Sequence, residues 1–337
     1  MMKRILRITT FIIFYTSLAK ISFAQDPQFS QFYASPLYLS PAFAGSTNGS
    51  RLVMNFRDQW PQIPGKFITY DFSFDHYFAG INSGIGLLVL SDQAGTGRLK
   101  RTQVGLQYAY AISLNPKWQI RQGIHFLRVF QSIDFNRLTF GDQLSFSGNA
   151  PASIEIPPLE KVGYYDAAAS AMIYSEKKWL GVTVDHLMQP NQAFEKNTKS
   201  IVPIKFSMFG GIKVKMDKTK KRILNEENIT VSALYKSQGK FDQLDLGFHY
   251  VKSPMMIGFW YRGIPGFKAY KKGYGNNDAL VLLAGLKIKN FIFGYSYDAT
   301  ISRLNISTGG AHELSMIIKI NQSQRRKKLS EVPCPEP

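Results

Sequence analysis

The 337-residue sequence is poor in the residues on which several classes of protein depend. It contains one cysteine and five scattered histidines, which argues against a disulfide scaffold and against a metal site. After the N-terminal region, no apolar run reaches the roughly 18 residues that a membrane-spanning helix needs. A disulfide-rich domain and a helical membrane protein are therefore both excluded.

Apolar and aromatic residues are instead abundant. Hydrophobic residues make up 45% of the chain and aromatic residues 14%, which is too apolar for a disordered protein. The 25 phenylalanines, 17 tyrosines and 27 glycines favour β structure. The formal net charge of +18 needs its own explanation, because basic chains are typical of proteins that bind nucleic acid, membrane surfaces or acidic partners.

The N-terminus has the pattern of a secretory signal peptide. Basic residues at positions 3, 4 and 7 precede an apolar stretch over residues 8–18, and small residues flank Phe23 shortly before Gln25. We expect cleavage after residue 24; the alternative is an uncleaved anchor, for which the apolar stretch is short. Cleavage removes four basic residues and no acidic one, which lowers the net charge to +14. Because export weakens the nucleic-acid interpretation, we predict no nucleic-acid partner.

The rest of the chain alternates between large apolar and small or polar residues. Over residues 104–112, the even positions carry Val, Leu, Tyr, Tyr and Ile, and the odd positions carry Gly, Gln and Ala. This period of two is typical of β-strands with one apolar face. The fourteen predicted strands span residues 50–57, 67–75, 83–91, 102–114, 118–134, 164–174, 179–188, 203–216, 228–237, 241–250, 255–262, 278–287, 290–298 and 312–320.

Alternation alone also fits a soluble β-sandwich, which we keep as a minor alternative. Two features favour a membrane barrel: the polar faces mix Gly, Ser, Ala and charge as a lumen does, and long connections alternate with short ones. Only the connections at 217–227 and 238–240 break that alternation. We therefore predict an all-β, transmembrane antiparallel β-barrel of about 14 strands, with long extracellular loops and short periplasmic turns.

This topology divides the chain into four parts. Residues 1–24 form the signal peptide, and residues 25–49 an N-terminal segment that lies in the periplasmic mouth, either as a plug or as a docking site. Residues 50–320 form the barrel in the outer membrane, with lipid around it. Residues 321–337 form a basic periplasmic tail.

Several short motifs resemble those of one known family. They lie in the same order along nearly the whole mature chain, at residues 25–32, 35–45, 57–61, 91–95, 105–111, 294–298, 301–304 and 309–313. The first begins Gln25-Asp26-Pro27, and the last contains Gly310, Ala311, His312 and Glu313. The chain thereby resembles the PorP/SprF family of type IX secretion and gliding-motility proteins.

The resemblance implies an outer-membrane barrel of the Bacteroidota secretion apparatus. Members of this family are needed for surface delivery or retention of particular exported proteins and connect with periplasmic components of the machinery. The resemblance carries over no enzymatic activity and no residue-level binding motif. We therefore predict no catalytic residue, no cofactor and no metal ligand.

The sequence itself offers little catalytic chemistry. His312-Glu313 lacks the second histidine of a zinc protease motif, and the glycines at residues 95–97 lack the strand-to-helix setting of a phosphate loop. His125, His249 and Asp298 fall on polar strand faces. There, hydrogen bonding in the lumen is the simpler interpretation, and a transport or gating role is the alternative.

Two further regions are candidates for partner contacts. The loop at 135–163 is apolar for its length, which fits either a plug that folds back or a partner surface. The tail carries a basic run and a cysteine that has no intramolecular partner, so it is either a solvated end or a docking site for an acidic partner. The predicted partner-binding residues are Phe140, Phe146, Ile154, Ile156, Arg325, Arg326, Lys327, Lys328 and Cys334.

The leading functional hypothesis follows from these observations. The protein is predicted to be a non-enzymatic outer-membrane component that receives, exports or anchors a surface protein and couples it to periplasmic machinery. The alternative is an outer-membrane transporter or channel for a small hydrophobic or polar solute, because fourteen strands leave room inside unless loops or the N-terminus fill it.

Overall fold

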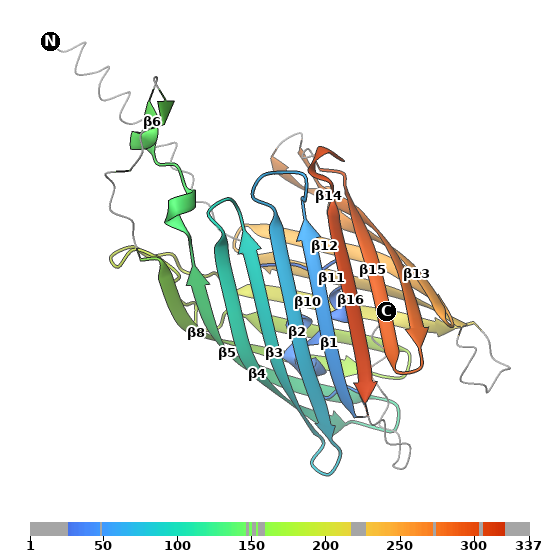
Figure 1. The fold of residues 1–337 in the computed structure, drawn as a ribbon. Coiled ribbons are helices and arrows are strands. Elements are labelled where there is room, and N and C mark those ends of the chain that lie inside the picture. The colour runs from blue at the N-terminus through green and yellow to red at the C-terminus, as the bar shows by residue number, and fades with distance from the viewer. Residues whose placement is uncertain are drawn as a thin grey trace.

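The computed structural model describes residues 26–47, 49–145, 148–149, 153, 159–216, 227–271, 274–302 and 306–320. Within them, fourteen antiparallel strands close into a barrel in which each strand pairs with its neighbours along the chain, and the first pairs with the last (Figure 1). The barrel strands are β1 (Ser50–Gln59), β2 (Phe67–Phe78), β3 (Ser83–Ala94), β4 (Leu99–Ser113), β5 (Gln119–Ser132), β8 (Lys161–Tyr174), β9 (Lys178–Asp185), β10 (Lys205–Lys215), β11 (Glu227–Gln238), β12 (Phe241–Lys252), β13 (Met255–Lys271), β14 (Tyr274–Ile288), β15 (Phe291–Thr300) and β16 (Ala311–Ile320).

Short elements complete the described chain. Three turns of helix precede the barrel, namely η1 (Phe32–Ala34), α2 (Pro36–Leu39) and η2 (Pro41–Phe43). The connection between β5 and β8 holds η3 (Phe135–Arg137), η4 (Gly141–Gln143) and a small hairpin of β6 (Leu144–Ser145) and β7 (Gly148–Asn149), and η5 (Ile306–Thr308) precedes β16. Of the helices in the described chain, none is long and apolar enough to cross a membrane.

The predicted barrel of fourteen strands is confirmed, and every predicted strand overlaps an observed one. β1 and β16 close it in register, with Ser50 opposite Ile320 and Gln59 opposite Ala311. Closure leaves no unpaired edge, so all ladder hydrogen bonds are made within the wall.

The two ends of the barrel differ in their connections. One end, which we call the loop end, carries residues 60–66, 133–160, 186–204 and 301–310. The other, the turn end, carries residues 79–82, 114–118, 175–177, 253–254 and 289–290. The loop end also has short connections: four residues between β3 and β4, two between β11 and β12 and two between β13 and β14, of which only the one between β11 and β12 was predicted to be short. At the turn end, the predicted exception between β10 and β11 lies almost wholly outside the described residues.

The hairpin of β13 and β14 is longer than predicted. The sequence predicted strands at 255–262 and 278–287 with a loop between them, because glycine, proline and asparagine interrupt the alternation there. In the structure the pairing continues to Lys271 and Tyr274, with register shifts that begin between Arg262 and Gly263. The irregular residues are accommodated as bulges in the ladder, so they do not end the strands.

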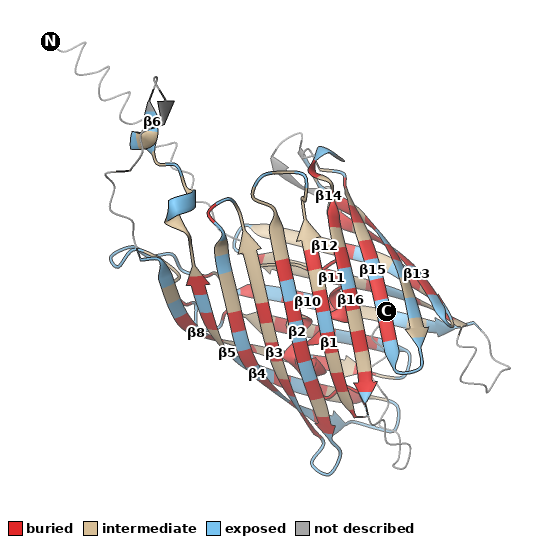
Figure 2. Ribbon diagram, in the orientation of Figure 1, coloured by how far each residue is buried: buried red, intermediate tan, exposed pale blue. Residues whose placement is uncertain are grey.

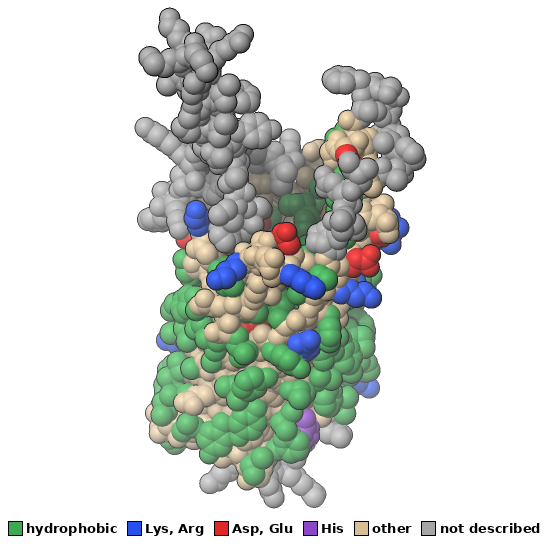
Figure 3. Space-filling model, turned by 90° about the vertical axis from the view of Figure 1, so that its left-hand side faces the viewer, with side chains coloured by type: hydrophobic (Ala, Val, Ile, Leu, Met, Phe, Trp, Pro, Cys, Tyr) green, Lys and Arg blue, Asp and Glu red, His purple; other side chains and the backbone are tan. Residues whose placement is uncertain are grey.

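Apolar side chains face outward and polar ones inward along the strands. In β4, Leu106 is 63% exposed, whereas its neighbour Gln107 is buried. Figure 2 shows the same alternation of buried and exposed positions along β1 to β5. In Figure 3 hydrophobic side chains cover the visible wall, and lysine and arginine gather towards the loop end. This is the pattern of a lipid-facing wall around a polar lumen.

The outward face gives a first prediction. We expect Leu106→Arg, at the middle of β4, to lower the free energy of unfolding in lipid vesicles by about 2–4 kcal/mol, because it places a charge in hydrocarbon. Leu144→Arg is the control, since Leu144 is equally apolar and 68% exposed but lies beyond the wall in β6. Urea titration of both variants in vesicles measures the effect, and equal losses would contradict the assigned lipid face.

Candidate functional site in the barrel lumen

Residues 26–47, here called the lumen segment, run through the inside of the barrel. Asp26 lies near the loop end, where it contacts Arg101 of β4, and Gly45 lies near the turn end, where its N–H donates to Asp75 of β2 over 2.8 Å. Nearly every side chain from residue 29 to 47 is buried. The segment therefore extends along the lumen. The sequence analysis had placed it in one mouth of the barrel only.

The local sequence explains why this segment is not a strand. Pro36 and Pro41 each occupy the first turn of a short helix, where proline's fixed φ is favourable. The Ser40 side chain accepts a hydrogen bond from the N–H of Ala42 and thereby caps η2. Backbone groups of the segment thus form hydrogen bonds within its own helical turns, and fewer of them remain for strand pairing.

Close packing fits the segment to the wall. A Cβ atom at Gly84 would lie 2.0 Å from the carbonyl oxygen of Ala44, and one at Gly123 would lie 2.3 Å from the nitrogen of Ala42. Glycine is required at both positions because the two backbones approach more closely than a side chain allows. Elsewhere in the lumen, the ring of Tyr33 stacks on the ring of Trp260 with 5.3 Å between their centroids.

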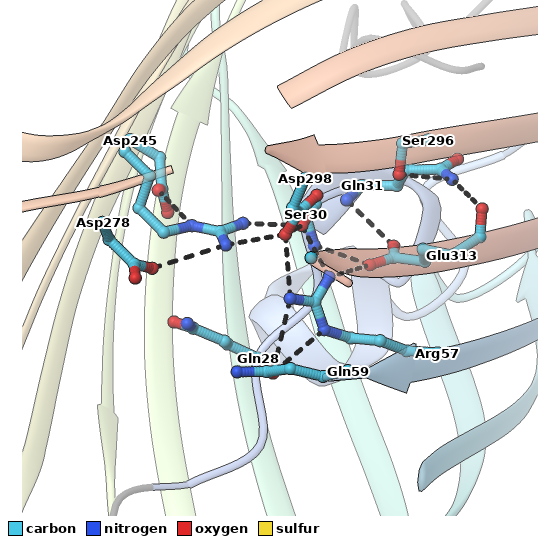
Figure 4. Close-up of polar contacts among 12 residues, drawn as sticks. Gln28, Ser30, Gln31, Arg57, Gln59, Asp245, Asp278, Ser296, Asp298 and Glu313 are labelled. Carbon is cyan, nitrogen blue, oxygen red and sulfur yellow. Dashed lines mark hydrogen bonds and ion pairs between the residues drawn. The ribbon is translucent and has the colours of Figure 1, made fainter. Parts of the chain in front are cut away.

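A buried network of ion pairs lies beside the first turns of the segment (Figure 4). Arg57 of β1 contacts Asp298 over 2.8 Å and Glu313 over 3.0 Å. Arg262 of β13 contacts the same oxygen of Asp298 over 2.9 Å and Asp245 over 3.0 Å. We call these five residues the arginine cluster. Each of their side chains is 5% exposed or less, so pairing must offset a large desolvation cost.

The arginine cluster holds the lumen segment directly. The backbone N–H groups of Ser30 and Gln31 donate to the two oxygens of Glu313 over 2.8 and 2.9 Å. The hydroxyl of Ser30 donates to Asp298 over 2.6 Å and accepts from both arginines, over 2.7 Å from Arg57 and 2.6 Å from Arg262. Ser30 is therefore bound by four groups from four strands, β1, β13, β15 and β16, which fixes where the segment lies.

A second cluster holds the first residue of the segment at the loop end. The carboxylate of Asp26 contacts Arg101 over 2.7 Å, His186 over 2.7 Å and Lys205 over 3.0 Å. Burial alone would raise the pKa of Asp26, but these three positive charges outweigh burial and hold that pKa well below its usual range. Asp26 is therefore ionised at neutral pH.

His186, just after β9, lies between two carboxylates. Its Nδ1 is 2.5 Å from Asp166, and its Nε2 contacts Asp26. Burial alone would lower the pKa of His186, but the charge of Asp26 and the hydrogen bonds to Asp166 and Asp26 raise it to about 9. The imidazolium form therefore ties the segment to the wall at neutral pH.

This histidine predicts a pH dependence. The stabilisation by His186 is complete below its unfolded pKa of about 6.5 and is lost as the pH rises through about 9. Between pH 6.5 and 9.5 we expect the free energy of unfolding of the wild type to fall by about 2–3 kcal/mol more than that of His186→Gln. Denaturant titrations in detergent at both pH values measure this, and parallel slopes for the two proteins would refute it.

The lumen is not filled everywhere. A cavity of about 640 Å³ lies above the lumen segment at the loop end. Its walls come from β1 and β10 to β14, and Asp26 to Phe29 form part of its floor. In the described part of the chain, no group of three His, Cys, Asp or Glu side chains could hold a metal ion. The arrangement binds and positions the chain's own segment.

Comparison with known proteins identifies the family. Residues 21–318 match the family described as type IX secretion system membrane protein PorP/SprF. The chain belongs to the PorP/SprF family. No curated protein matches it.

Solved structures similar to this PorP/SprF chain share little sequence with it. The Acinetobacter baumannii outer membrane protein Omp33 is 8% identical, with 82% of this chain and 100% of that chain covered and a TM-score of 0.45. The monoaromatic hydrocarbon channel CymD is 9% identical, with 84% and 90% covered and a TM-score of 0.44. A Pseudomonas aeruginosa FadL homologue is 12% identical, with 80% and 90% covered and a TM-score of 0.40.

The residues predicted to bind partners fall mostly outside the described part of this PorP/SprF chain. Phe140 is half-buried in the connection between β5 and β8, beside η4, where its N–H donates to Gln143 over 2.9 Å. That connection lies beyond the strand ends at the loop end (Figure 1). The others, which lie outside the described residues, are Phe146, Ile154, Ile156, Arg325, Arg326, Lys327, Lys328 and Cys334.

The sequence interpretation missed most of the arginine cluster. His125, His249 and Asp298 were placed on the polar faces, and all three are buried in the lumen. The role of Arg57 and Glu313 was not predicted, although both stand in motifs that carry the family resemblance. The available signal was a full charge at an inward strand position, such as Arg57, together with full charges of opposite sign at inward positions of other strands, such as Asp298 and Glu313.

Proposed function

We propose that the protein is a non-enzymatic outer-membrane component of the type IX secretion and gliding machinery that receives, exports or anchors a surface protein. Membership of the PorP/SprF family carries this proposal. The lumen segment supports it, because buried ion pairs fix this segment where a solute would have to pass. A barrel with such a segment in its lumen can bind partners at its two ends, whereas the segment obstructs the passage of a solute.

The proposed topology places the loop end outside the cell and the turn end in the periplasm. Short turns at the periplasmic end are typical of outer-membrane barrels. β1 begins and β16 ends at the turn end, so the basic tail at 321–337 follows directly from it. We infer that Arg325 to Lys328 and Cys334 serve periplasmic components of the machinery. The loop with Phe140, Phe146, Ile154 and Ile156 then serves the exported protein.

Gene deletion and rescue test the proposal. Deletion should cause a particular surface protein to be lost from the cell surface, and the full-length gene should restore it. A gene truncated after residue 320 should restore the barrel but not co-purification of periplasmic components with the tagged protein. Lys117→Gln and Lys177→Gln are matched controls, since both lysines are exposed at the turn end outside the tail. Unchanged export and retention of all surface proteins after deletion would refute the proposal.

A further inference from the structure

Three basic side chains lie together on the outer face of the wall at its loop end. Lys100 of β4, Arg128 of β5 and Lys161 of β8, here called the basic cluster, line one hollow of about 390 Å³. Among the described residues, no carboxylate lines this hollow. These strands lie at the left of Figure 1, the side that Figure 3 turns towards the viewer, where lysine and arginine side chains gather along the loop-end border of the hydrophobic wall.

The register of the strands places the two lysines nearer the loop end than the arginine. Lys100 and Lys161 both lie opposite Ser132, in the last pairs before the loops. Arg128 lies four residues deeper in β5, opposite Val104 of β4. The lysines are therefore at the border of the lipid-facing wall, whereas the arginine is set into it.

The guanidinium of Arg128 is directed towards the lysines. Its Nη2 lies 3.0 Å from the position that a Cβ atom of Gly163 would occupy, and Gly163 is two residues nearer the loop end than Tyr165, the residue opposite Arg128. The Cζ of Arg128 lies 4.3 Å from the ring centroid of Tyr165 and 5.4 Å from that of Phe130. Cation–π contacts on both rings thus hold the guanidinium in the space that the glycine leaves open.

The positive charge of the basic cluster is not compensated within the described chain. None of its three side chains forms an ion pair with a described residue. An adjoining hollow nearer the loops adds Arg98, Asp134 and Glu160, but Asp134 already pairs with Arg137 over 3.0 Å. With both hollows counted, four basic side chains face one carboxylate that has no described partner, so the excess of positive charge remains.

Exposed apolar side chains continue the wall on the membrane side of the basic cluster. Phe126 and Leu106 lie opposite each other, two residues deeper than Arg128 and Val104, and both are exposed. Aromatic residues at the border of the apolar band, such as Tyr165, are typical of the membrane interface of a barrel. A ligand held by the basic cluster would therefore lie directly against hydrocarbon-facing surface.

We propose that this face binds a phosphorylated lipid of the surrounding membrane, with the phosphate on the basic cluster and the acyl chains along Leu106 and Phe126. A guanidinium presents paired donors that match two phosphate oxygens, and the lysines add charge. A soluble anion would leave the apolar surface uncovered. A lipid whose phosphate carries its own cation would leave the basic cluster unmatched. Placement of the lipid in the outer leaflet rests on the proposed topology, whereas the binding itself does not.

Lipid binding to the purified full-length protein in detergent tests the proposal. The probes are dioleoylphosphatidic acid and dioleoylphosphatidylcholine, which have the same acyl chains but differ in the cation on the phosphate, and native mass spectrometry measures their binding. We expect phosphatidic acid to bind at least tenfold more tightly than phosphatidylcholine. Arg128→Gln should remove most of this preference.

Two further variants keep the test valid if Arg128→Gln does not fold. Lys100→Gln and Lys161→Gln, combined in one protein, change only exposed side chains and should reduce the preference at least fivefold. Lys178→Gln is the matched control, because Lys178 is exposed at the turn end in β9. We expect this control to bind both lipids as the wild type does.

Three results would overturn the inference. These are equal affinity for the two lipids, equal loss in the control and in the double lysine variant, or displacement of phosphatidic acid by glycerol 3-phosphate at similar concentrations. The last result would show that the phosphate is recognised without the acyl chains. The proposed function fails separately, through unchanged surface proteins after gene deletion, and that outcome would leave the lipid site standing.

Discussion

Replacing Arg57 by methionine is expected to lower the free energy of unfolding by about 3–5 kcal/mol, because it removes one partner from a buried set of charges. The two carboxylates that Arg57 contacts, Asp298 and Glu313, would stay buried at 3% exposure or less. Asp298 would still form its ion pair with Arg262. Glu313 would be left with hydrogen bonds from the uncharged N–H groups of Ser30 and Gln31. Methionine fills a similar volume, so the expected loss is electrostatic and not due to a cavity.

Denaturant titration in detergent, followed by tryptophan fluorescence, measures this loss. Trp260 stacks on Tyr33 of the lumen segment, so its emission also reports whether the segment has left its place. Lys66→Met is the matched control, because Lys66 pairs with Asp58 over 2.8 Å but is 43% exposed. Exposed pairs contribute about 0–1 kcal/mol. Comparable losses in the two variants would show that the arginine cluster does not hold the structure together.

The wall could be predicted from the sequence because a period of two determines it. Large residues at alternate positions, as in β4, fix both the strand and the side that faces lipid. Extended strands then pair with the next barrel strand along the chain, and the closure between β1 and β16 joins the two ends of the described barrel. The end of β13 was missed because Gly263 and Pro265 interrupt the alternation although the backbone pairing continues.

The arginine cluster could not be predicted in the same way. Ser30 and Glu313 are 283 positions apart in the chain, and Arg57 and Asp298 are 241 apart. No local pattern indicates that these residues meet, because their meeting depends on the closed barrel and on the path of the lumen segment inside it. The composition of that segment excludes a strand, but its path depends on individual contacts such as the one between Gln107 and the carbonyl of Leu37.

The lumen network also accounts for some of the basic residues of the chain. Arg51, Arg57, Arg101, Lys205 and Arg262 all point inward and pair with buried carboxylates. These charges are therefore largely neutralised within the barrel. The excess of positive charge is left for the surfaces and for segments such as the tail, where it is available to acidic partners or lipid headgroups.

Displacing the lumen segment from the barrel is expected to turn a barrel whose lumen is blocked into one that conducts ions. Gly123→Val places side-chain atoms where the nitrogen of Ala42 now lies, 2.3 Å from the Cβ position. The wall there is held by paired strands on both sides, so the segment is the part that must move. Fourteen strands enclose more space than their own side chains fill, and water and ions would enter the vacated lumen.

Planar bilayer recordings measure this conversion. We expect at least a tenfold increase in the frequency of ion-conducting steps for Gly123→Val over the wild type, and a larger one after deletion of residues 26–46. Gly80→Val is the matched control, because no atom lies within 4 Å of its Cβ position in the turn between β2 and β3. A wild type that already conducts would favour the solute channel over the proposed function. A deletion variant that stays closed would mean that the lumen segment is not what blocks the barrel.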